Sequence, residues 1–381
     1  MVRYTLSALL AVASSTYVAA QTITSSQAPT TTSSQEFPAT PLASKHFSYP
    51  SQIPYKVDTD SFGRGTQFGY NLCNSTTENQ QSLCQTSFVN HVDDFCLWAP
   101  AVINSTIADT EGEEVAWCTK KGRGTRLMPE GTLQGVQYLK TPDYVLIAGF
   151  IDQTKINMQA GDFGGELDPH GQDLRGNPLG GLMYSNVYGG GNDNNTYTQV
   201  IEWTNFMGGN AFCIKVCDPA GANAANYCQH VFDRIGCAYN APNNAQNGTF
   251  EHCDSDNMEF PGQYVSNGVT MTYSQPPESL GPITTMPYTA VVPASSNCVT
   301  FSSDQLYTDL ASVTASGSTP SASASATASG SSSGSRGSTS ASRSGSASSS
   351  SATGATSGAA STAVSLVAGI VGVAFSMIAL A

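Results

Sequence analysis

The chain has little charge, and positive charge is the scarcer kind. Charged residues make up 11% of its 381 residues, with 15 Lys and Arg against 28 Asp and Glu. The charged residues outside 21–310 are Arg3, Arg336 and Arg343, so residues 21–310 carry a net charge of about −16. Nucleic acid and anionic lipid are bound by basic patches that release counterions. We therefore expect no nucleic-acid partner and no direct binding to lipid headgroups.

The sequence also lacks the common motifs of cofactor and metal sites. It contains no P-loop, no G-x-G-x-x-G, no H-E-x-x-H and no C-x-x-C. A G-x-S-x-G motif occurs at residues 330–334, but this serine-rich stretch is not expected to form the strand and helix that expose a nucleophilic serine. Cys213 and Cys217 have no second cysteine pair at zinc-site spacing. The five histidines are each interpreted as structural. We predict no cofactor and no metal site.

Long apolar runs are confined to the two ends of the chain. Residues 1–20 combine a basic residue, an apolar stretch and small residues, which predicts a signal peptide cleaved after Ala20. Residues 363–381 are apolar and uncharged and follow a small, polar segment, which favours a GPI-anchor signal with attachment near Ser351 or Gly354. The alternative is a tail anchor, which usually carries a basic flank. We expect an extracellular protein of the cell surface or cell wall, held to the membrane through a GPI anchor only.

Two Ser/Thr-rich segments flank the central region. Residues 21–44 contain almost no apolar bulk and are predicted to be a disordered linker. Residues 311–362 have Ser or Thr at 29 of 52 positions, which predicts an O-glycosylated stalk. Residues 45–310 are long enough to bury a sizeable core. We expect these central residues to form one globular domain.

The central region holds all ten cysteines, and export would oxidise them to five disulfides. They are Cys73, Cys84, Cys96, Cys118, Cys213, Cys217, Cys228, Cys237, Cys253 and Cys298. The 95-residue step after Cys118 separates a set of four from a set of six, and it favours pairing within each set, although spacing does not give the individual pairs. Four N-x-S/T sequons predict N-linked glycans at Asn74, Asn104, Asn194 and Asn247.

Short β-like segments dominate the central region. Residues 144–151 form a continuous apolar run typical of a buried strand, and residues 211–216 and 269–273 alternate in polarity. We predict a mainly β fold, or an α+β fold with few short helices, stabilised by disulfides.

Helical signals are fewer. Residues 75–78 match the capping-box pattern, and Cys84, Phe88, Val92 and Cys96 recur every four residues, which predicts a helix face. A second short helix is expected around residues 223–235.

An acidic, glycine-rich segment at residues 161–171 is the main candidate for catalytic chemistry. It contains Glu166, Asp168 and His170, which could act as general acid and base or provide oxygen ligands to Ca²⁺. A glycosidase uses two carboxylates about 5–10 Å apart, so Glu166 or Asp168 could pair with Glu202. The competing interpretation is an acidic surface loop without catalytic function, and we favour it.

Aromatic side chains suggest a different function, because exposed rings can stack on sugars. The candidates are Trp98, Trp117, Trp203, Tyr184, Tyr188 and Tyr197. The competing interpretation is that these rings pack in the core.

The centre of the chain resembles a known group of fungal proteins. The motif EWTNFMGGNAFCIKVCDP at residues 202–219, with YCQH at 227–230 and DRIGCAYN at 233–240, is similar to the basidiomycete macrophage-activating glycoproteins and the cryptococcal immunoreactive mannoproteins. The resemblance covers residues from about 45 to 300. It implies a cell-surface or cell-wall mannoprotein whose glycans are recognised by host immune lectin receptors, and it implies no catalytic residue.

We therefore expect a noncatalytic structural or immunoreactive mannoprotein with a GPI anchor. Two alternatives remain open: a surface module that binds cell-wall polysaccharide, and an extracellular glycoside hydrolase.

Overall fold

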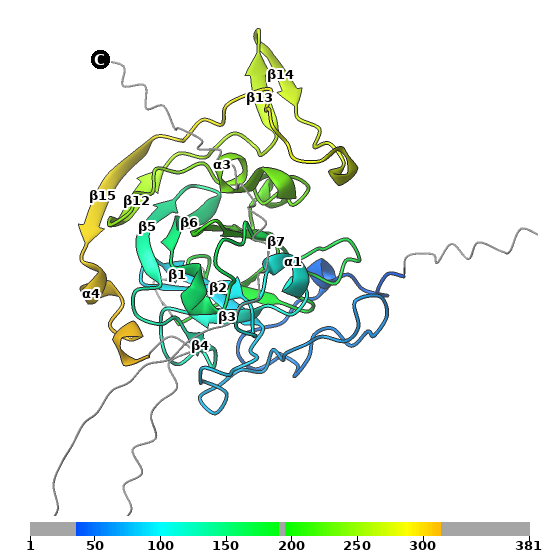
Figure 1. Cartoon of the computed structure of the whole chain (residues 1–381), viewed down its shortest axis with the longest axis vertical. Helices are drawn as coiled ribbons and strands as arrows, with labels where there is room; N and C mark the ends of the chain where they lie inside the picture. The colour runs from blue at the N-terminus through cyan, green and yellow to red at the C-terminus, as the bar shows by residue number, and fades with distance from the viewer. Residues whose placement is uncertain (1–35, 190–194, 314–381) are drawn as a thin grey trace, which may run out of the picture. The chain divides into compact units, whose positions relative to one another are not determined.

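Two stacked β-sheets form the centre of the computed structural model, which describes residues 36–189 and 195–313 (Figure 1). The six-stranded sheet has the order β4-β3-β2-β1-β8-β9. Its strands are β1 (Thr86–His91), β2 (Asp94–Ala99), β3 (Val115–Cys118), β4 (Arg126–Leu127), β8 (Leu182–Ser185) and β9 (Thr198–Val200). This architecture confirms the mainly β prediction.

The second sheet has seven strands in the order β15-β12-β5-β6-β11-β10-β7, which places β7 at one edge. Its strands are β5 (Leu133–Lys140), β6 (Tyr144–Ile151), β7 (Gly165–Leu167), β10 (Trp203–Gly208), β11 (Ala211–Cys217), β12 (Phe250–Ser255) and β15 (Ser295–Phe301). A separate hairpin joins β13 (Gln263–Ser266) to β14 (Val269–Thr272). The predicted strand 144–151 is β6, and the predicted strands 211–216 and 269–273 correspond to β11 and β14.

Helices are short throughout the described residues. The α-helices are α1 (Ile107–Thr110), α2 (Ala224–Tyr227), α3 (Gly236–Asn240) and α4 (Ser303–Leu306). The 3-10 turns are η1 (Leu42–Ser44), η2 (Gln153–Ile156), η3 (Asp233–Ile235), η4 (Glu278–Leu280) and η5 (Leu310–Ser312). None of the described helices is long and apolar enough to cross a lipid bilayer.

The main core lies between the two sheets. The rings of Trp98 and Trp203 are 5.9 Å apart and those of Phe95 and Phe212 are 6.0 Å apart, so each pair joins the two sheets. All four side chains are at most 1% exposed. The backbone N–H of Trp98 also donates to Asn205 Oδ1 at 3.0 Å, which adds a polar contact within this interface.

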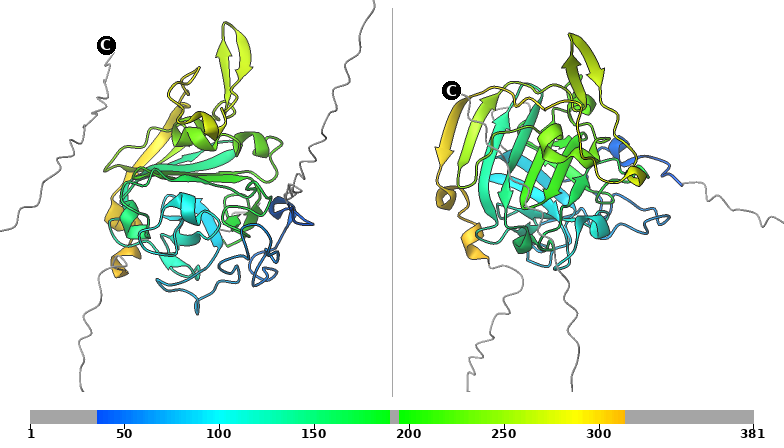
Figure 2. Two further views of the ribbon diagram at one scale, coloured as in Figure 1. Left: turned by 45° about the vertical axis from the view of Figure 1, so that its right-hand side comes forward. Right: turned by 45° about the horizontal axis from the view of Figure 1, so that its top comes forward.

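A second core covers the opposite face of the seven-stranded sheet. Leu146 on β6 and Phe206 on β10 pack there with Tyr227 and Met258, while the neighbouring Ile147 belongs to the core between the sheets. Figure 2 shows the short helices of residues 218–262 above this face. Because both faces of β6 are buried, its sequence is one continuous apolar run and does not alternate between polar and apolar residues.

All ten cysteines form disulfides, and every pair stays within the predicted sets of four and six. The pairs are Cys73–Cys84, Cys96–Cys118, Cys213–Cys237, Cys217–Cys228 and Cys253–Cys298. The third and fourth pairs tie the segment after β11 to that strand. This segment therefore stays packed over the outer face of the sheet.

The helix predicted through Cys84, Phe88, Val92 and Cys96 is wrong. These residues lie before β1, on β1, in the turn and on β2, which pair as an antiparallel hairpin. A spacing of four is also an even number, so it places residues on one face of a strand as well as of a helix.

Two further helical predictions also fail or hold only in part. Residues 75–78 form a turn in which Glu78 Oε2 accepts the backbone N–H of Gly124 at 3.2 Å, so there is no capping box. The helix expected at 223–235 is limited to α2 and η3, because the Cys217–Cys228 disulfide redirects the chain between them.

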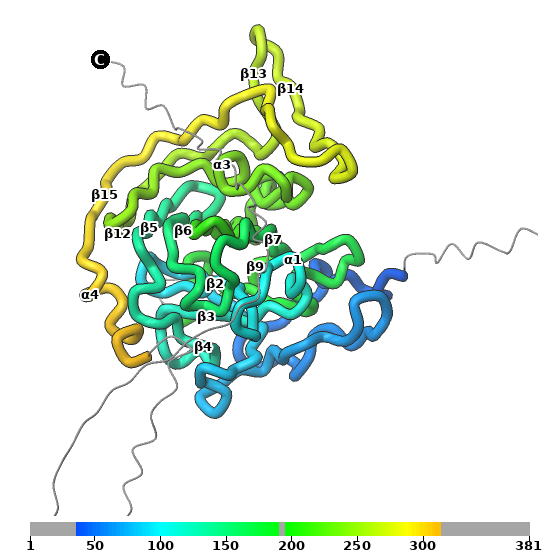
Figure 3. The backbone as a smooth tube through the Cα atoms, in the orientation of Figure 1, coloured from blue at the N-terminus to red at the C-terminus, as the bar shows by residue number. Residues whose placement is uncertain are grey.

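The segment before β1 runs along the outside of the sheets, as Figure 3 shows. Buried polar side chains hold it in place. Arg175 is 1% exposed and its Nε donates to Asp58 Oδ2 at 2.8 Å, while Asn71 Nδ2 donates to the carbonyl of Gly180 at 2.8 Å. These contacts position Arg64 beside the site described below.

The predicted signal peptide, the GPI attachment residues Ser351 and Gly354, the apolar tail and the sequon at Asn194 all lie outside the described residues. The domain limits 45 and 310 stay predictions.

Gly164 provides a test of how closely β7 approaches β10. Its φ is +77°, and a Cβ there would lie 1.4 Å from the carbonyl oxygen of Met207. Gly161 has a similar φ of +78° but nothing within 4 Å of a Cβ. We expect Gly161→Ala to destabilise the fold by about 1–2 kcal/mol from its left-handed backbone. Gly164→Ala should cost a further ~1–3 kcal/mol from the backbone clash. Urea unfolding of both variants measures the difference, and equal losses would contradict the strand contact.

Candidate functional site

A cleft of about 1010 Å³ lies at the edge of the seven-stranded sheet formed by β7. Glu166 and Phe206 line it from the sheet, and Glu111 lines it from the segment after α1. Arg64 and Asp233 also line it, from the segment before β1 and from η3. The volume is at the upper end of the range for small-molecule sites.

Glu166 is a buried carboxyl group of this cleft. Its residue is 5% exposed, and neither carboxyl oxygen has a hydrogen-bond partner among the described residues. Burial raises the pKa of Glu166 well above its usual value, and the nearby Asp168 and Asp233 raise it further. Glu166 therefore retains its proton over a wider pH range than an exposed glutamate does.

Asp168 lies two residues further along, on the same side of the extended chain as Glu166. Unlike Glu166, it is surrounded by donors. Its Oδ1 accepts the backbone N–H groups of His170 and Gly171, each at 2.8 Å, and its Oδ2 accepts Asn177 Nδ2 at 3.2 Å. Two neighbouring carboxyl groups in such different environments are typical of acid–base sites.

A polar network also supports Asp168 through Asn177, with which it forms an antiparallel β-bridge. Asn177 Nδ2 also donates to Glu111 Oε1 at 2.6 Å, and Asn177 Oδ1 accepts Arg64 Nη1. Arg64 forms an ion pair with Asp173 at 2.6 Å. Burial, followed by the charge of Asp168, raises the pKa of Glu111. The network therefore fixes the orientation of Asp168.

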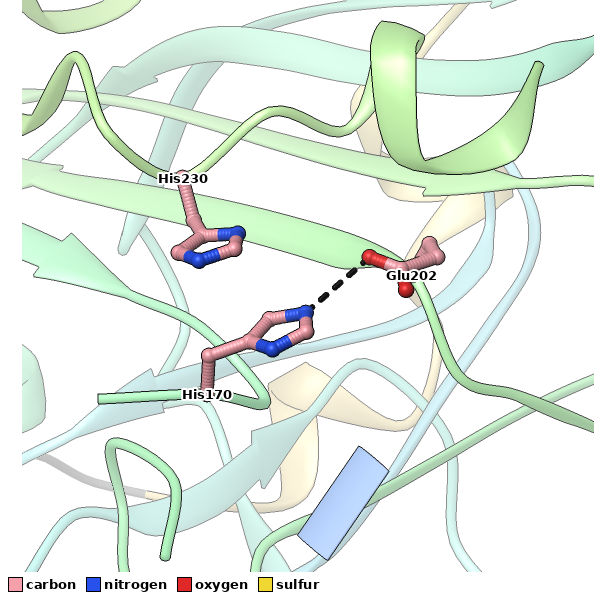
Figure 4. A group of neighbouring side chains, drawn as sticks. All are labelled: His170, Glu202 and His230. Carbon is pink, nitrogen blue, oxygen red and sulfur yellow. Dashed lines mark hydrogen bonds and ion pairs between the residues drawn. The ribbon is translucent and has the colours of Figure 1, made fainter. Parts of the chain in front are cut away.

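His170, Glu202 and His230 form a cluster beside the cleft (Figure 4). His170 Nε2 and Glu202 Oε2 are 3.1 Å apart. The two imidazole rings stack with centroids 3.8 Å apart and an interplanar angle of 9°. Burial lowers the pKa of His230, and the neighbouring His170 lowers it further.

The structure places the predicted carboxylates in two groups. Glu166 and Asp168 line the cleft together, whereas Glu202 lines a neighbouring cavity of about 750 Å³ and contacts His170. Asp162, in the same acidic segment, accepts the backbone N–H of Ile107 at 2.9 Å and so helps to position α1. The segment 161–171 therefore contains β7 and one side of the cleft, and it is more than a surface loop.

Most of the aromatic residues suggested for sugar stacking are buried. Trp98, Trp117, Trp203 and Tyr184 are at most 1% exposed, so the competing interpretation holds for these four candidates: they pack in the core. Tyr188 and Tyr197 are half-buried, and the Tyr188 hydroxyl donates to the carbonyl of Val216 at 2.9 Å.

An aromatic residue that the sequence analysis missed does line the cleft. Phe163 is 93% exposed. Its position in a glycine-rich segment, where it has no strand neighbours to pack against, is the sequence feature that predicts its exposure.

Three of the predicted glycosylation sites lie in the part of the chain that the structure describes. Asn74, Asn104 and Asn247 are all exposed, as attached glycans require, and glycosylation itself stays a prediction.

The raised pKa of Glu166 gives a pH-dependent stability. Below its ordinary value of about 4.5, Glu166 is protonated in the folded and unfolded chain alike. As the pH rises from there toward the folded pKa, only the unfolded chain releases this proton, so the free energy of unfolding falls by up to ~1.4 kcal/mol per pH unit. Glu166→Gln should remove this contribution, and its stability relative to the unsubstituted chain should grow between pH 4.5 and 7.

Thermal and urea unfolding across this range measure that difference. Glu113→Gln, which changes an exposed carboxyl group near α1, is the control and should show no such trend. A Glu166→Gln difference that does not change with pH would contradict the buried, unpartnered carboxyl group.

Comparison with known proteins identifies two fungal relatives from Mycosarcoma maydis. The chain is 43% identical to the appressorium protein ROW2 over 219 residues, which cover 56% of this chain and 72% of ROW2. It is 44% identical to the appressorium protein ROW1 over 214 residues, which cover 56% of this chain and 49% of ROW1. The match thus spans about half the length of ROW1.

No protein-family model and no solved structure matches the chain. The relatives support a fungal family, and they do not single out the mannoprotein group that the central motif resembles. On the identity and coverage shared with ROW2, the chain belongs to the fungal family of this appressorium protein.

Proposed function

We propose that this protein is a fungal cell-surface glycoprotein that binds a cell-wall oligosaccharide in the cleft at β7. The observation that carries the proposal is the lining of the cleft: the unpartnered carboxyl group of Glu166 lies in the same cleft as the exposed ring of Phe163. A sugar ring presents hydroxyl groups at its edge and an apolar face of C–H groups. These are the partners that convergent polar groups and an aromatic ring can bind.

The surface location is supported by the sequence signals and the relatives. A signal peptide, a stalk and a GPI anchor would display the central region outside the cell. Both relatives are named as appressorium proteins, which fits a surface role in a fungus. A wall mannoprotein recognised by host lectins through its glycans is compatible with this role, and the three exposed sequons would provide N-linked attachment points.

A second candidate function is hydrolysis of the bound glycan. The observation that favours it is the contrast between Glu166, whose pKa is raised, and Asp168, which accepts three N–H donors. A glycosidase needs a protonated carboxylic acid to protonate the leaving oxygen, together with an ionised carboxylate. Glu166 would be the acid and Asp168 the carboxylate.

Sugar binding is tested with the full secreted chain on an array of glucan, chitin and mannan oligosaccharides. We expect dose-dependent binding to one of these classes, and Phe163→Ala should weaken it about tenfold, which corresponds to ~1.4 kcal/mol. Phe37→Ala changes a 52% exposed phenylalanine that does not line the cleft, and it should leave binding unchanged. Absence of binding to every glycan, or equal loss in both variants, would reject the cleft as a sugar site and favour a structural role.

Hydrolysis is separated from binding by Glu166→Gln, which keeps the shape of the side chain but cannot donate the carboxylic proton. If the protein is a hydrolase, this variant should bind the same oligosaccharide and lose at least about 100-fold in turnover, the usual range for loss of a general acid. Unchanged turnover in the variant would remove Glu166 as the acid.

The anchor is tested on intact fungal cells with a phosphatidylinositol-specific phospholipase. We expect release of the protein, and mass spectrometry of the released chain should find no peptide from residues 363–381. Recovery of that apolar tail in the mature protein would contradict GPI processing, whether or not the wall retains the chain.

A further inference from the structure

We propose that His170, Glu202 and His230 bind a divalent transition-metal ion of the zinc class. The three side chains come from separate parts of the chain: the segment after β7, the residue before β10, and the segment between α2 and η3. One ligand atom from each lies within 4.8 Å of the other two (Figure 4). This site goes beyond the proposed sugar binding and does not depend on it.

The spacing of the ligand atoms is close to that of a metal-bound set. Zinc binds histidine nitrogen and carboxylate oxygen at about 2.0–2.2 Å, which places tetrahedral ligand atoms about 3.3–3.5 Å apart. His170 Nε2 and Glu202 Oε2 are already 3.1 Å apart. The ligand atom of His230 lies within 4.8 Å of both, and its ring would have to rotate out of the parallel stack for its lone pair to point at the ion.

The backbone around each ligand is firmly held. Asp168 Oδ1 accepts the backbone N–H of His170 at 2.8 Å. The backbone carbonyl of Glu202 accepts the N–H of Cys217 at 3.0 Å, and the same Cys217 forms a disulfide with Cys228, two residues before His230. One residue of β11 therefore ties two of the three ligands to the same end of the sheet.

An unpartnered atom provides independent support for a ligand. The Nδ1 atom of His230 is buried and has no hydrogen-bond partner among the described residues. A structural role for the cluster would explain the contact between His170 and Glu202 and the stacking of the rings. It leaves this nitrogen without a partner, which is costly in a buried position.

The composition of the cluster selects the class of ion. Ca²⁺ and Mg²⁺ prefer oxygen ligands, whereas imidazole suits zinc, copper, nickel and iron. Two histidines and one carboxylate leave at least one coordination position for water or substrate, as in catalytic zinc sites. His230 also lines the cleft that contains Glu166, so the ion would lie beside the proposed sugar site.

The test uses the full secreted chain without an affinity tag, stripped of metal and titrated with zinc chloride by calorimetry at pH 7.5. We expect one equivalent to bind with a micromolar or lower Kd. Glu202→Gln and His230→Gln should each weaken binding at least tenfold. His252→Gln, which changes a histidine outside the cluster, should bind as the unsubstituted chain does. Calcium chloride should not compete.

Cobalt chloride gives a second readout, because its visible absorption reports nitrogen and oxygen coordination directly. The protein should develop a tetrahedral or five-coordinate cobalt spectrum that is lost in the His170→Gln, His230→Gln double variant, with circular dichroism confirming that this variant is folded. Failure of the unsubstituted chain to bind zinc, or binding retained by all cluster variants, would overturn the proposal. Glycan binding by metal-free protein would leave the sugar proposal standing when the metal proposal fails.

Discussion

Burial of both faces of the central strands of the seven-stranded sheet, β5, β6, β11 and β10, is the constraint on which the rest of the molecule depends. The six-stranded sheet covers one face of these strands, and the disulfide-tied residues 218–241, together with Met258, cover the other. Charged groups on the second face are therefore desolvated. Lys215 is 1% exposed, and burial lowers its pKa to about 7, while its Nζ donates to the carbonyl of Asn240 at 2.6 Å. Glu166, at the β7 edge, is buried and has no such partner among the described residues, so the desolvation of its carboxyl group is not offset by a hydrogen bond.

The sequence predicted the strands better than the helices, and the reason is the local periodicity. The sequence predicts strand β6 with its observed bounds because a run of eight apolar residues has the length of a strand and is shorter than a typical helix. The four-residue recurrence from Cys84 to Cys96 predicted a helix wrongly because a spacing of four keeps residues on one face of a helix and, being even, also on one face of a strand. The turn between β1 and β2 contains no glycine or proline to mark the break.

The candidate site was only partly predictable for a different reason. Glu166 and Asp168 could be identified because they are close in sequence, but their unequal hydrogen bonding depends on Asn177 and on the backbone after Asp168. His170 and His230 are 60 positions apart, and no spacing rule connects them. Their contact exists because the pairing of β7 with β10 places His170, and the Cys217–Cys228 disulfide places His230, at the same end of the sheet. The tryptophans were candidates for exposure, but composition alone does not report which face of a strand a ring occupies.

The connectivity of the disulfides has a consequence for biogenesis. The pairs follow one another along the chain, with sequence separations of 11 to 45 residues, and Cys217–Cys228 is nested within Cys213–Cys237. No pair crosses another. If the chain is exported as its predicted signal peptide implies, the two partners of each pair would enter the endoplasmic reticulum within a short interval of each other, and oxidation could proceed in the order of translocation. A chain with this arrangement can reach its native bonds during synthesis with little need for a disulfide isomerase to exchange wrong ones.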